Sequence, residues 1–448
     1  MCIFFDSYRP KLALCMLKVV DNLHFLIIYC ILLLGDIMDL IYKREDYLKK
    51  IRSFYKDNMI KVITGIRRCG KSSLLKSIIE ELKGNGIKEK DIIYIELDKK
   101  EYKNIKNPKQ LEKIIDSLVV DSDFKYLFID EVQNVKGFET VVNAYREEGN
   151  FSIFLTGSNS YLLSGELITK LTGRYIEFEM LPLNFREYVL MKKFLNKVVN
   201  DNIYKEFEEF VRCGGFPGSL YYDNYEDKML YTKNVINQIF EKDIKRNKKI
   251  KDKQLFEVVQ KFVINNFGSR MSVSSIYNYL TKDKNIKVDR RTIKGYIDVL
   301  EQAKIIYACD MFDIKSKDVL DGEKKYYLAD TSLYFMLNTD NRINYGPVLE
   351  NILFSYFKSK GYLLSVGKIG KLEIDFIVRK GIDNYYYVQV SKNIDDDRTK
   401  EREYKPFYAI KEMYPRYLFV LDLIFQENID GIKNINLVEF IYNNEELV

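Results

Sequence analysis

Short apolar runs alternate with segments of helical periodicity between residues 38 and 190. Each run is four to six residues long and is typical of a strand buried on both faces of a parallel sheet. The predicted strands are Ile60–Thr64, Ile92–Leu97, Tyr126–Asp130, Ser152–Thr156 and Tyr175–Phe178. Strands that alternate with helices in this way predict an α/β domain with a parallel sheet built from βαβ units.

The pattern changes twice after this region. Residues 191–250 are helical, with one interruption at Gly214–Pro217. Residues 251–335 predict three helices followed by two strands, Ile305–Asp313 and Lys324–Ala329, which flank a polar turn containing Asp321-Gly322. Residues 336–448 predict a helix and then mainly strands. The chain therefore contains four candidate folded segments, preceded by an apolar leader at residues 1–37.

The leader is short for a membrane span. Its longest stretch without Lys, Arg, Asp or Glu is Asn22–Gly35, which is 14 residues, whereas a spanning helix needs about 20. No small-residue cleavage site follows, as a signal peptide would require. We therefore expect translation to start at Met38 and expect no membrane partner. A membrane anchor and a packed helix are the alternatives.

Composition argues against several classes of site. The one histidine, His24, lies in the leader, which disfavours zinc sites and Ser-His-Asp catalysis. The six cysteines have no CxxC spacing, so no disulfide framework is indicated and a cytoplasmic location is expected. The net charge of +6, from 71 basic and 65 acidic residues, is too small to indicate a partner by itself.

A glycine-rich loop follows the first predicted strand. Its residues match the pattern G-x-x-x-x-G-K-[ST], with a strand before it and a helix after it. Such a loop wraps phosphates with its backbone N–H groups, while the lysine contacts the β- and γ-phosphates and the hydroxyl binds Mg²⁺. The predicted nucleotide-binding residues are Gly65, Ile66, Arg67, Arg68, Cys69, Gly70, Lys71, Ser72 and Ser73. We therefore expect ATP and Mg²⁺ as ligands, with Lys71 on the phosphates and Ser72 on the metal.

Two carboxylates follow the third predicted strand. Asp130 and Glu131 end the sequence YLFIDE, and the carboxyl end of a parallel strand lies at the edge of the sheet that carries the glycine-rich loop. Asp130 is expected to hold Mg²⁺, and Glu131 to act as the general base that polarises the attacking water. A simple strand cap is the alternative interpretation of this pair.

Polar residues near the last two strands complete the candidate site. Ser158 or Asn159, in SIFLTGSNS, could contact the γ-phosphate or the attacking water, and an ordinary polar loop is the alternative. Arg174, in LTGRY, is a candidate arginine finger that acts on the nucleotide of its own chain or of a neighbouring subunit. A surface ion pair is the alternative for Arg174.

Five motifs together resemble the AAA-type ATPases of prokaryotes in which the ATPase domain is joined to a C-terminal region of uncharacterised function. They are GIRRCGKSS, YLFIDEVQ, FLTGSNS, LTGRY and PLNFREY, and the resemblance extends from about Met38 to the end of the chain. It implies a P-loop NTPase core at 38–190 with strand order 5-1-4-3-2, followed by a helical lid at 191–250. It also implies a winged helix at 251–335 and a domain similar to the PD-(D/E)xK nucleases at 336–448.

The residues of the third segment are compatible with a winged helix that contacts DNA. Its third helix, from Asp289 to Ile305, would be the recognition helix. The basic residues near its start are Lys282, Lys284, Lys287, Arg290, Arg291 and Lys294. They could contact phosphates or base edges. Winged helices also dock proteins, so both DNA and a protein partner stay open.

The nuclease-like segment departs from the pattern of active members. Glu350 and Asp375 match two of the expected carboxylates, but Gln389 and Ser391 stand where the resemblance implies a glutamate and a lysine. The site therefore lacks a carboxylate and the cation that active members use together with Mg²⁺. We expect this segment to be a scaffold or a nucleic-acid-binding remnant without nuclease activity.

The sequence thus predicts an AAA+-type ATPase that hydrolyses ATP to drive conformational change in C-terminal DNA- or partner-binding domains. A signalling switch with slow turnover and a DNA-binding regulator with a vestigial ATPase are the alternatives. The oligomeric state stays open, with a homo-oligomer among the possibilities.

Overall fold

The computed structural model describes residues 41–120, 124–157, 171, 173–244, 250–338, 342–382, 384–423 and 427–448. The predicted leader at residues 1–37 lies outside these ranges. The chain divides into a unit Met1–Lys43 and a unit Arg44–Val448, and the elements described below belong to the second unit. Within the described ranges, no helix is long and apolar enough to cross a membrane.

The first sheet of the second unit consists of five parallel strands. They are β1 (Ile60–Gly65), β2 (Ile92–Glu96), β3 (Lys125–Asp130), β4 (Phe151–Thr156) and β5 (Tyr175–Met180). All five predicted strands are confirmed, and their ends differ from the prediction by no more than two residues. The spatial order is β2-β3-β4-β1-β5, which is the order 5-1-4-3-2 that the AAA resemblance implies.

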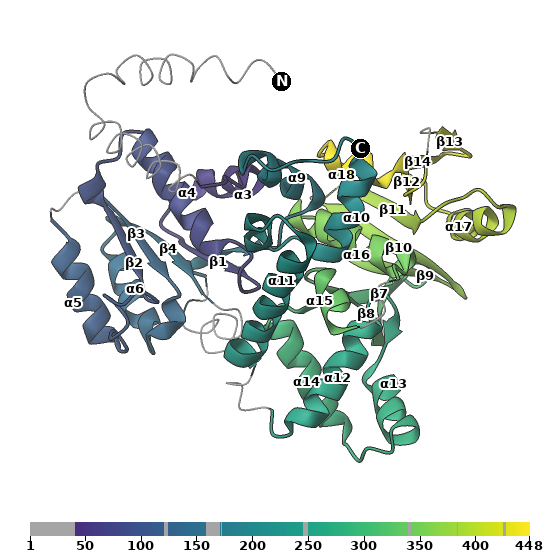
Figure 1. Ribbon diagram of the computed structural model, residues 1–448, viewed down its shortest axis with the longest axis horizontal. Coiled ribbons are helices and arrows are strands. Elements are labelled where there is room, and N and C mark those ends of the chain that lie inside the picture. The colour runs from purple at the N-terminus through teal and green to yellow at the C-terminus, as the bar shows by residue number, and fades with distance from the viewer. Residues whose placement is uncertain are drawn as a thin grey trace. The chain divides into compact units, whose positions relative to one another are not determined.

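Helices cover this sheet, with α4 on one side of it and α5 and α6 on the other (Figure 1). α5 (Pro108–Leu118) and α6 (Phe138–Glu147) pack against alternate strand residues, such as Leu127 and Ile129, in one buried cluster. α4 (Lys71–Gly84) packs against β1, β3 and β4. Both faces of the strands are therefore covered by apolar contacts, which explains why the strands appear in the sequence as unbroken apolar runs.

Helices precede and follow the sheet. α3 (Glu45–Ile51) comes just before β1, and Asn caps begin the three helices that come after β5. These helices are α9 (Phe185–Phe194), α10 (Ile203–Cys213) and α11 (Tyr225–Ile239). The predicted interruption near Gly214–Pro217 is present between α10 and α11, where a short 3-10 helix covers Pro217–Tyr221.

Three helices and two antiparallel strands follow, in the predicted order. They are α12 (Lys253–Asn265), α13 (Val273–Asn278), α14 (Arg290–Gln302), β7 (Ile306–Asp313) and β8 (Asp318–Leu328). The turn predicted at Asp321-Gly322 is wrong. The chain turns between β7 and β8 instead, and Gly322 lies in a bulge of β8, where its φ is +96°. At this bulge the pairing jumps from Asp310 opposite Lys324 to Met311 opposite Leu320.

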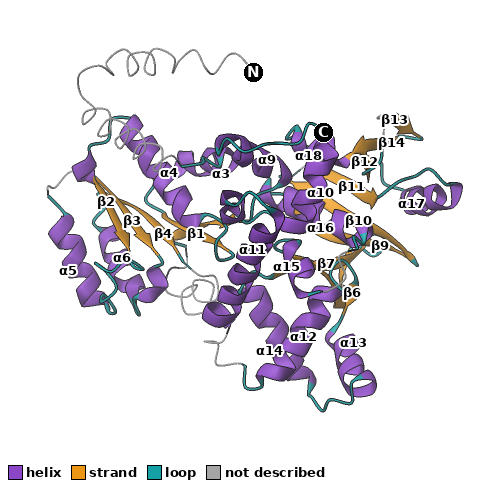
Figure 2. Cartoon of the chain, in the orientation of Figure 1, coloured by secondary structure: helices purple, strands orange, loops and turns teal. Residues whose placement is uncertain are grey.

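The second sheet is mixed and contains nine described strands in the order β13-β14-β12-β11-β10-β9-β7-β8-β6 (Figure 2). The strands not yet introduced are β6 (Arg270–Met271), β9 (Leu363–Ile369), β10 (Leu372–Lys380), β11 (Asn384–Ser391), β12 (Arg416–Val420), β13 (Glu427–Ile429) and β14 (Ile432–Asn436). The accompanying helices are α15 (Ser332–Leu337), α16 (Tyr345–Ser359), α17 (Asp397–Ala409) and α18 (Leu437–Tyr442). β7 pairs in parallel with β9, so this sheet runs across the boundary that the sequence predicts between residues 335 and 336.

Candidate functional site

The glycine-rich loop connects β1 to α4, and its first and last glycines are required by geometry. Gly65 pairs in register with Met180 of β5, and a Cβ atom at Gly65 would lie 2.3 Å from the Met180 carbonyl oxygen. Gly70 has a φ of +109°, a conformation that side chains with a Cβ rarely adopt. The backbone can therefore approach a ligand closely between these two positions.

Lys71 is the first residue of α4, and its side chain folds back onto the loop. Its Nζ atom donates hydrogen bonds to the carbonyl oxygens of Gly65 at 2.9 Å and Ile66 at 3.3 Å. Only 6% of Lys71 is exposed. Both acceptors are neutral, so they solvate the ammonium group without cancelling its charge. The cation is therefore available to an anionic ligand at the loop.

The other loop residues differ in exposure. Cys69 is fully buried, and this burial raises the pKa of its thiol, which supports an inert packing role over a redox role. Arg68 is exposed and Arg67 is half-buried. Ser72 is half-buried and Ser73 is exposed in the first turn of α4.

Asp130 is buried at the carboxyl end of β3, next to a hydroxyl group from β4. The Thr156 hydroxyl donates to Asp130 Oδ1, and the Tyr94 hydroxyl lies 3.4 Å from Asp130 Oδ2. Thr156 also pairs in register with Ile63 of β1, the strand that leads into the loop. Thr156 is not among the site residues predicted from the sequence. As the polar last residue of a predicted central strand, it could have been found by the same argument that found Asp130.

Glu131 has an unusual backbone conformation. Its φ is +58°, in the left-handed region, which costs on the order of 1 kcal/mol for a residue with a Cβ. Its N–H donates to Thr156 Oγ1 at 3.1 Å, and the Gln133 amide donates to its carboxylate. The surrounding contacts therefore hold the Glu131 carboxylate in a defined orientation, as a general base requires.

The chemistry of this edge of the sheet fits Mg²⁺. A serine hydroxyl (Ser72) and a carboxylate (Asp130) are hard oxygen ligands, and Mg²⁺ in nucleotide sites takes only one or two protein ligands beside phosphates and water. Ser72 and Asp130 are thus the residues that would hold the ion.

Arg174 lies at the opposite edge of the sheet. It directly precedes β5, and its carbonyl oxygen accepts the N–H of Ile60, the first residue of β1, at 2.9 Å. The six residues of β1 then separate it from the loop, a length of about 20 Å at 3.3 Å per residue. The prediction that Arg174 acts on the nucleotide of its own chain is therefore wrong on geometric grounds. Its role toward a neighbouring subunit stays a prediction, and Ser158 and Asn159 lie outside the described residues.

The six basic residues predicted to contact DNA are all exposed between α13 and the second turn of α14. The Arg290 guanidinium lies over the Tyr277 ring at 5.0 Å, and Asp289 caps α14. The six basic side chains are thus exposed to solvent along one short stretch of the chain, residues 282–294.

A second cluster of charged groups lies in the C-terminal sheet. Lys325 of β8 is 4% exposed, and its Nζ atom is 2.8 Å from Glu350 Oε2, 2.8 Å from Glu373 Oε1 and 3.8 Å from Asp375 Oδ1. The Tyr327 hydroxyl donates to Glu350 at 3.0 Å. Glu350 and Asp375 are predicted from the sequence, but Lys325 is not, because no motif around Lys325 connects this residue with the two carboxylates.

The pKa shifts in this cluster reflect one cation shared by three carboxylates. Burial raises the pKa of Glu350, and burial together with the charge of Glu350 raises the pKa of Asp375. Burial alone would lower the pKa of Lys325, but the three carboxylates outweigh it and raise that pKa. Lys325 therefore stays charged, and Glu350 and Asp375 bind protons more readily than usual. Burial would also raise the pKa of Glu373, but Lys325 and Arg270 outweigh it and lower that pKa.

The residues at the motif positions of β11 hold the backbone instead of a ligand. Gln389 accepts the N–H of Asp375 at 3.0 Å and donates to Glu403 at 3.1 Å, and the Ser391 hydroxyl donates to the Asn393 carbonyl at 2.8 Å. A divalent ion between Glu350 and Asp375 would face the Lys325 ammonium, a like charge. Among the residues that the structure describes, no group of three or more His, Cys, Asp or Glu could hold a metal ion. Lys325 supplies from β8 the cation that the sequence predicted to be missing, and it engages both carboxylates that the resemblance assigns to the metal.

Two family models match the chain. A model described as an AAA domain matches residues 57–189, and a model described as a domain of unknown function (DUF8612) matches residues 204–342. The first covers β1 to α9 with the glycine-rich loop, Asp130 and Glu131. The chain therefore contains an AAA-type, P-loop ATPase domain, whose fold is the five-stranded parallel sheet.

Relatives match almost the whole chain. An uncharacterized protein of Haemophilus influenzae is 34% identical over 89% of this chain and 98% of its own length. An uncharacterized protein of Methanocaldococcus jannaschii is 31% identical over 87% of this chain and 83% of its own length. Among solved structures, the Walker-type ATPase of Pyrococcus abyssi is similar over 67% of this chain and 96% of that one, with a TM-score of 0.48 and 18% identity. The chain belongs to the family of the Haemophilus and Methanocaldococcus proteins.

Proposed function

We propose that this chain hydrolyses Mg·ATP in its AAA domain and that the hydrolysis cycle changes the conformation of its C-terminal helices and sheet. The observation that carries the proposal is the convergence of Lys71, Asp130 and Glu131 at one edge of a parallel sheet, each held by neutral partners. Charged groups held in this way keep their full charge for a ligand.

Each residue has a distinct role in this proposal. The loop N–H groups bind the phosphates, Lys71 balances the charge of the β- and γ-phosphates, and Ser72 with Asp130 holds Mg²⁺. Glu131 takes the proton of the attacking water, and its orientation by Gln133 and Thr156 keeps the carboxylate on that water. Arg174 completes the site only if a neighbouring copy is present.

The test compares wild type with Glu131→Gln in steady-state ATP turnover and in binding of a non-hydrolysable ATP analogue. We expect Glu131→Gln to bind the analogue with wild-type affinity and to lose turnover by at least about 100-fold, the lower end of the range for general-base catalysis. Glu147→Gln is the matched control, since Glu147 is exposed at the end of α6 and pairs with Arg146. Equal, slow turnover of wild type and Glu131→Gln with and without DNA would favour the signalling switch.

We further propose that the cations around α14 contact DNA. The side chains of these cations are exposed and lie close together in sequence, between α13 and the second turn of α14, which supports phosphate binding. The double variant Arg290→Gln/Arg291→Gln is expected to weaken binding to duplex DNA and to reduce its salt dependence, while basal ATP turnover stays unchanged. Unaltered DNA affinity would favour a protein partner. A vestigial ATPase would be favoured if Lys71→Ala left both DNA affinity and biological effect intact.

The Lys325 cluster is proposed to be structural, so the chain is not a nuclease. Lys325 pairs with both Glu350 and Asp375, the carboxylates that a metal-dependent centre would use, and no group of three or more His, Cys, Asp or Glu among the described residues could hold a metal ion. Supercoiled plasmid incubated with the wild-type chain and Mg²⁺ or Mn²⁺ is expected to stay intact. Cleavage that Asp375→Ala abolishes would overturn this proposal.

A further inference from the structure

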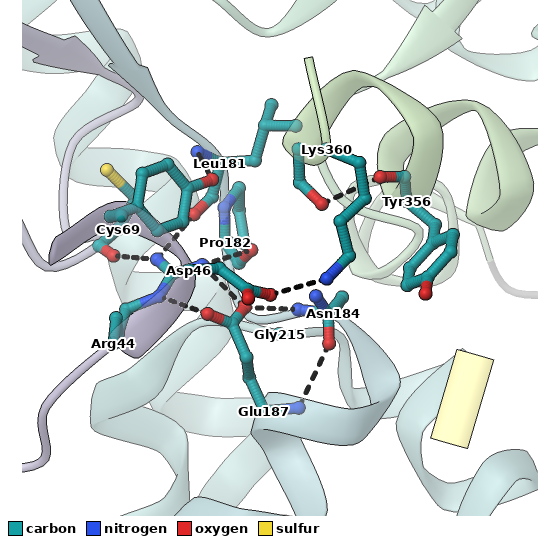
Figure 3. Close-up of polar contacts among 12 residues, drawn as sticks. Arg44, Asp46, Cys69, Leu181, Pro182, Asn184, Glu187, Gly215, Tyr356 and Lys360 are labelled. Atoms are coloured by element: carbon teal, nitrogen blue, oxygen red, sulfur yellow. Dashed lines mark hydrogen bonds and ion pairs between the residues drawn. The ribbon is translucent and has the colours of Figure 1, made fainter. Parts of the chain in front are cut away.

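Arg44 is a buried cation that joins the phosphate-binding loop to two other backbone carbonyls and one carboxylate. It is the N-cap of α3 and is 5% exposed. Its Nη1 atom donates to the Cys69 carbonyl at 3.1 Å and the Leu181 carbonyl at 2.7 Å, and Nη2 donates to the Pro182 carbonyl at 3.2 Å (Figure 3). Its remaining side-chain hydrogen bonds are two to Glu187, at 2.9 and 2.6 Å, and its guanidinium lies over the Tyr47 ring at 4.5 Å.

The contact with Cys69 acts on a peptide group of the loop. A peptide is planar and trans, so its carbonyl oxygen and the following N–H point in opposite directions. Arg44 holds the Cys69 oxygen, and the N–H of Gly70 is thereby directed to the opposite side of that peptide. The N–H groups of such loops are the phosphate ligands. Arg44 can therefore orient one phosphate ligand without touching the nucleotide.

Arg44 is itself held by a rigid partner. Glu187 belongs to the capping box of α9, in which Asn184 accepts the Glu187 N–H at 3.0 Å and Glu187 accepts the Asn184 N–H at 3.0 Å. Burial alone would lower the pKa of Arg44, but Glu187 outweighs it and raises that pKa. The planar fork of an arginine matches this set of acceptors, whereas the compact ammonium of a lysine does not.

Helix α3, whose N-cap is Arg44, also contacts the C-terminal half of the chain. Asp46 accepts a hydrogen bond at 2.7 Å from Lys360, which follows α16, and the Lys50 ammonium donates to the Ser359 carbonyl (Figure 3 shows the Asp46–Lys360 pair). α16 also carries Glu350 of the Lys325 cluster. The contact of Arg44 with the loop and the contact of Asp46 with the end of α16 thus lie within one turn of each other at the start of α3.

We propose that Arg44 is a positioning residue for the phosphate-binding loop and that α3 couples nucleotide binding to the end of α16. The proposal rests on the ATPase function proposed above. Nucleotide that orders the Cys69–Gly70 peptide strengthens the Arg44 contact and fixes α3, and α3 then fixes residues 359–361 through Asp46 and Lys50. The coupling is reciprocal, because a partner that holds α16 favours nucleotide binding to the same extent.

The first experiment measures Mg·ATP affinity in Arg44→Lys, with Arg52→Lys as the control. Arg52 pairs with Glu45 and Glu81 on the surface next to the same helix. We expect Arg44→Lys to weaken binding by about tenfold, the loss of one or two charge-assisted hydrogen bonds, and Arg52→Lys to bind as wild type. Thermal unfolding of each nucleotide-free variant is recorded beside it, because a purely structural Arg44 would lower Tm and leave the affinity of the folded protein unchanged.

The second experiment follows backbone hydrogen exchange with and without Mg·ATP. In wild type we expect nucleotide to slow exchange in α3 and at residues 359–361. Asp46→Asn is expected to bind Mg·ATP within twofold of wild type and to weaken the effect at 359–361, where the Lys50–Ser359 contact remains. Lys360→Gln removes the Asp46–Lys360 pair from its other side. The inference is overturned if Arg44→Lys binds normally, or if Asp46→Asn and Lys360→Gln keep the effect at 359–361 undiminished. Absence of nucleotide binding by wild type would instead refute the proposed function.

Discussion

Two buried lysines show how differently this chain uses the same side chain. Lys71 is 6% exposed and Lys325 is 4% exposed, so burial does not distinguish them. Lys71 contacts two neutral peptide carbonyls, whereas Lys325 contacts two carboxylates at 2.8 Å and a third at 3.8 Å. The charge of the acceptor, more than burial, decides whether a buried cation is available to a ligand or already neutralised within the fold.

The carboxylates of the two sites follow the same division. Asp130 and Glu131 are held by hydroxyl and amide donors, which orient them and leave their charge intact. Glu350 and Asp375 share a lysine, which cancels part of their charge. The first site is organised to bind a cation and a polyphosphate, and the second is organised to hold β8, β10 and α16 together.

The largest expected effect is on ATP turnover, which should distinguish Lys71 from Lys325. Lys71→Ala is expected to reduce ATP turnover by at least about 100-fold, because the transition state loses a preorganised cation next to the γ-phosphate. Lys325→Met is expected to leave turnover per folded molecule unchanged. Steady-state ATP hydrolysis, normalised to the folded fraction from circular dichroism, is the measurement. A comparable loss in both variants would remove the distinction.

The next effect separates them by stability. Lys325→Met leaves Glu350 and Asp375 without their cation, while Glu373 keeps its ion pair with Arg270. The substitution is expected to cost about 3–5 kcal/mol in the free energy of unfolding, measured by urea denaturation. Lys324→Met is the control, because its exposed pair with Asp310 should contribute no more than about 1 kcal/mol. Lys71→Ala is expected to unfold close to wild type, since it leaves only neutral carbonyls behind.

The loss in Lys325→Met should depend on pH. Without the lysine, Glu350 and Asp375 in the folded variant have pKa values above those of the unfolded chain, because burial and mutual repulsion oppose their ionisation. The folded state then binds more protons than the unfolded state. Stability is therefore retained below the unfolded pKa of about 4 and lost as pH rises through the folded values. Equal loss at pH 5 and pH 8 would contradict this account.

Local pattern was sufficient for the first site and insufficient for the second. The strands of the parallel sheet are buried on both faces, and the glycine-rich loop is one continuous stretch, so both are visible in the sequence. Lys325 lies 25 residues before Glu350, and Arg44 lies 143 residues before Glu187. Such pairs depend on tertiary placement that no local pattern encodes. The Asp321-Gly322 prediction failed because a turn dipeptide can also occupy a bulge.

A smaller effect tests whether neutral donors orient the first site. Thr156→Val keeps the shape of the side chain but removes the hydroxyl that contacts both Asp130 and the Glu131 N–H. One hydrogen bond to a charged group is worth about 1.5–3 kcal/mol, so turnover should fall by roughly tenfold or somewhat more. Thr156→Ser keeps the hydroxyl and should retain most activity. Full activity of Thr156→Val would mean that Asp130 and Glu131 are oriented by other contacts.

The smallest effect is expected where the second site loses a carboxylate instead of its cation. Asp375→Asn keeps an acceptor for the Val390 N–H, now bonded at 2.9 Å, and leaves Lys325 with Glu350 and Glu373. Because burial and Glu350 raise the pKa of Asp375, its charged form is already disfavoured in the fold. The change in unfolding free energy should therefore stay within about 1 kcal/mol at neutral pH.

The sign of this small change should follow pH. A carboxyl group whose pKa is raised by folding contributes stability below its unfolded pKa and loses it as pH rises through the folded value. Asp375→Asn removes that loss. The free energy of unfolding of the variant, relative to that of wild type, should therefore increase from acidic to alkaline pH in parallel urea titrations. A neutral amide that costs as much as Lys325→Met would mean that the charge of Asp375 is essential to the cluster. The three carboxylates would then form a charged binding site occupied by Lys325. The distinction between a ligand-binding Lys71 and a structural Lys325 would fail.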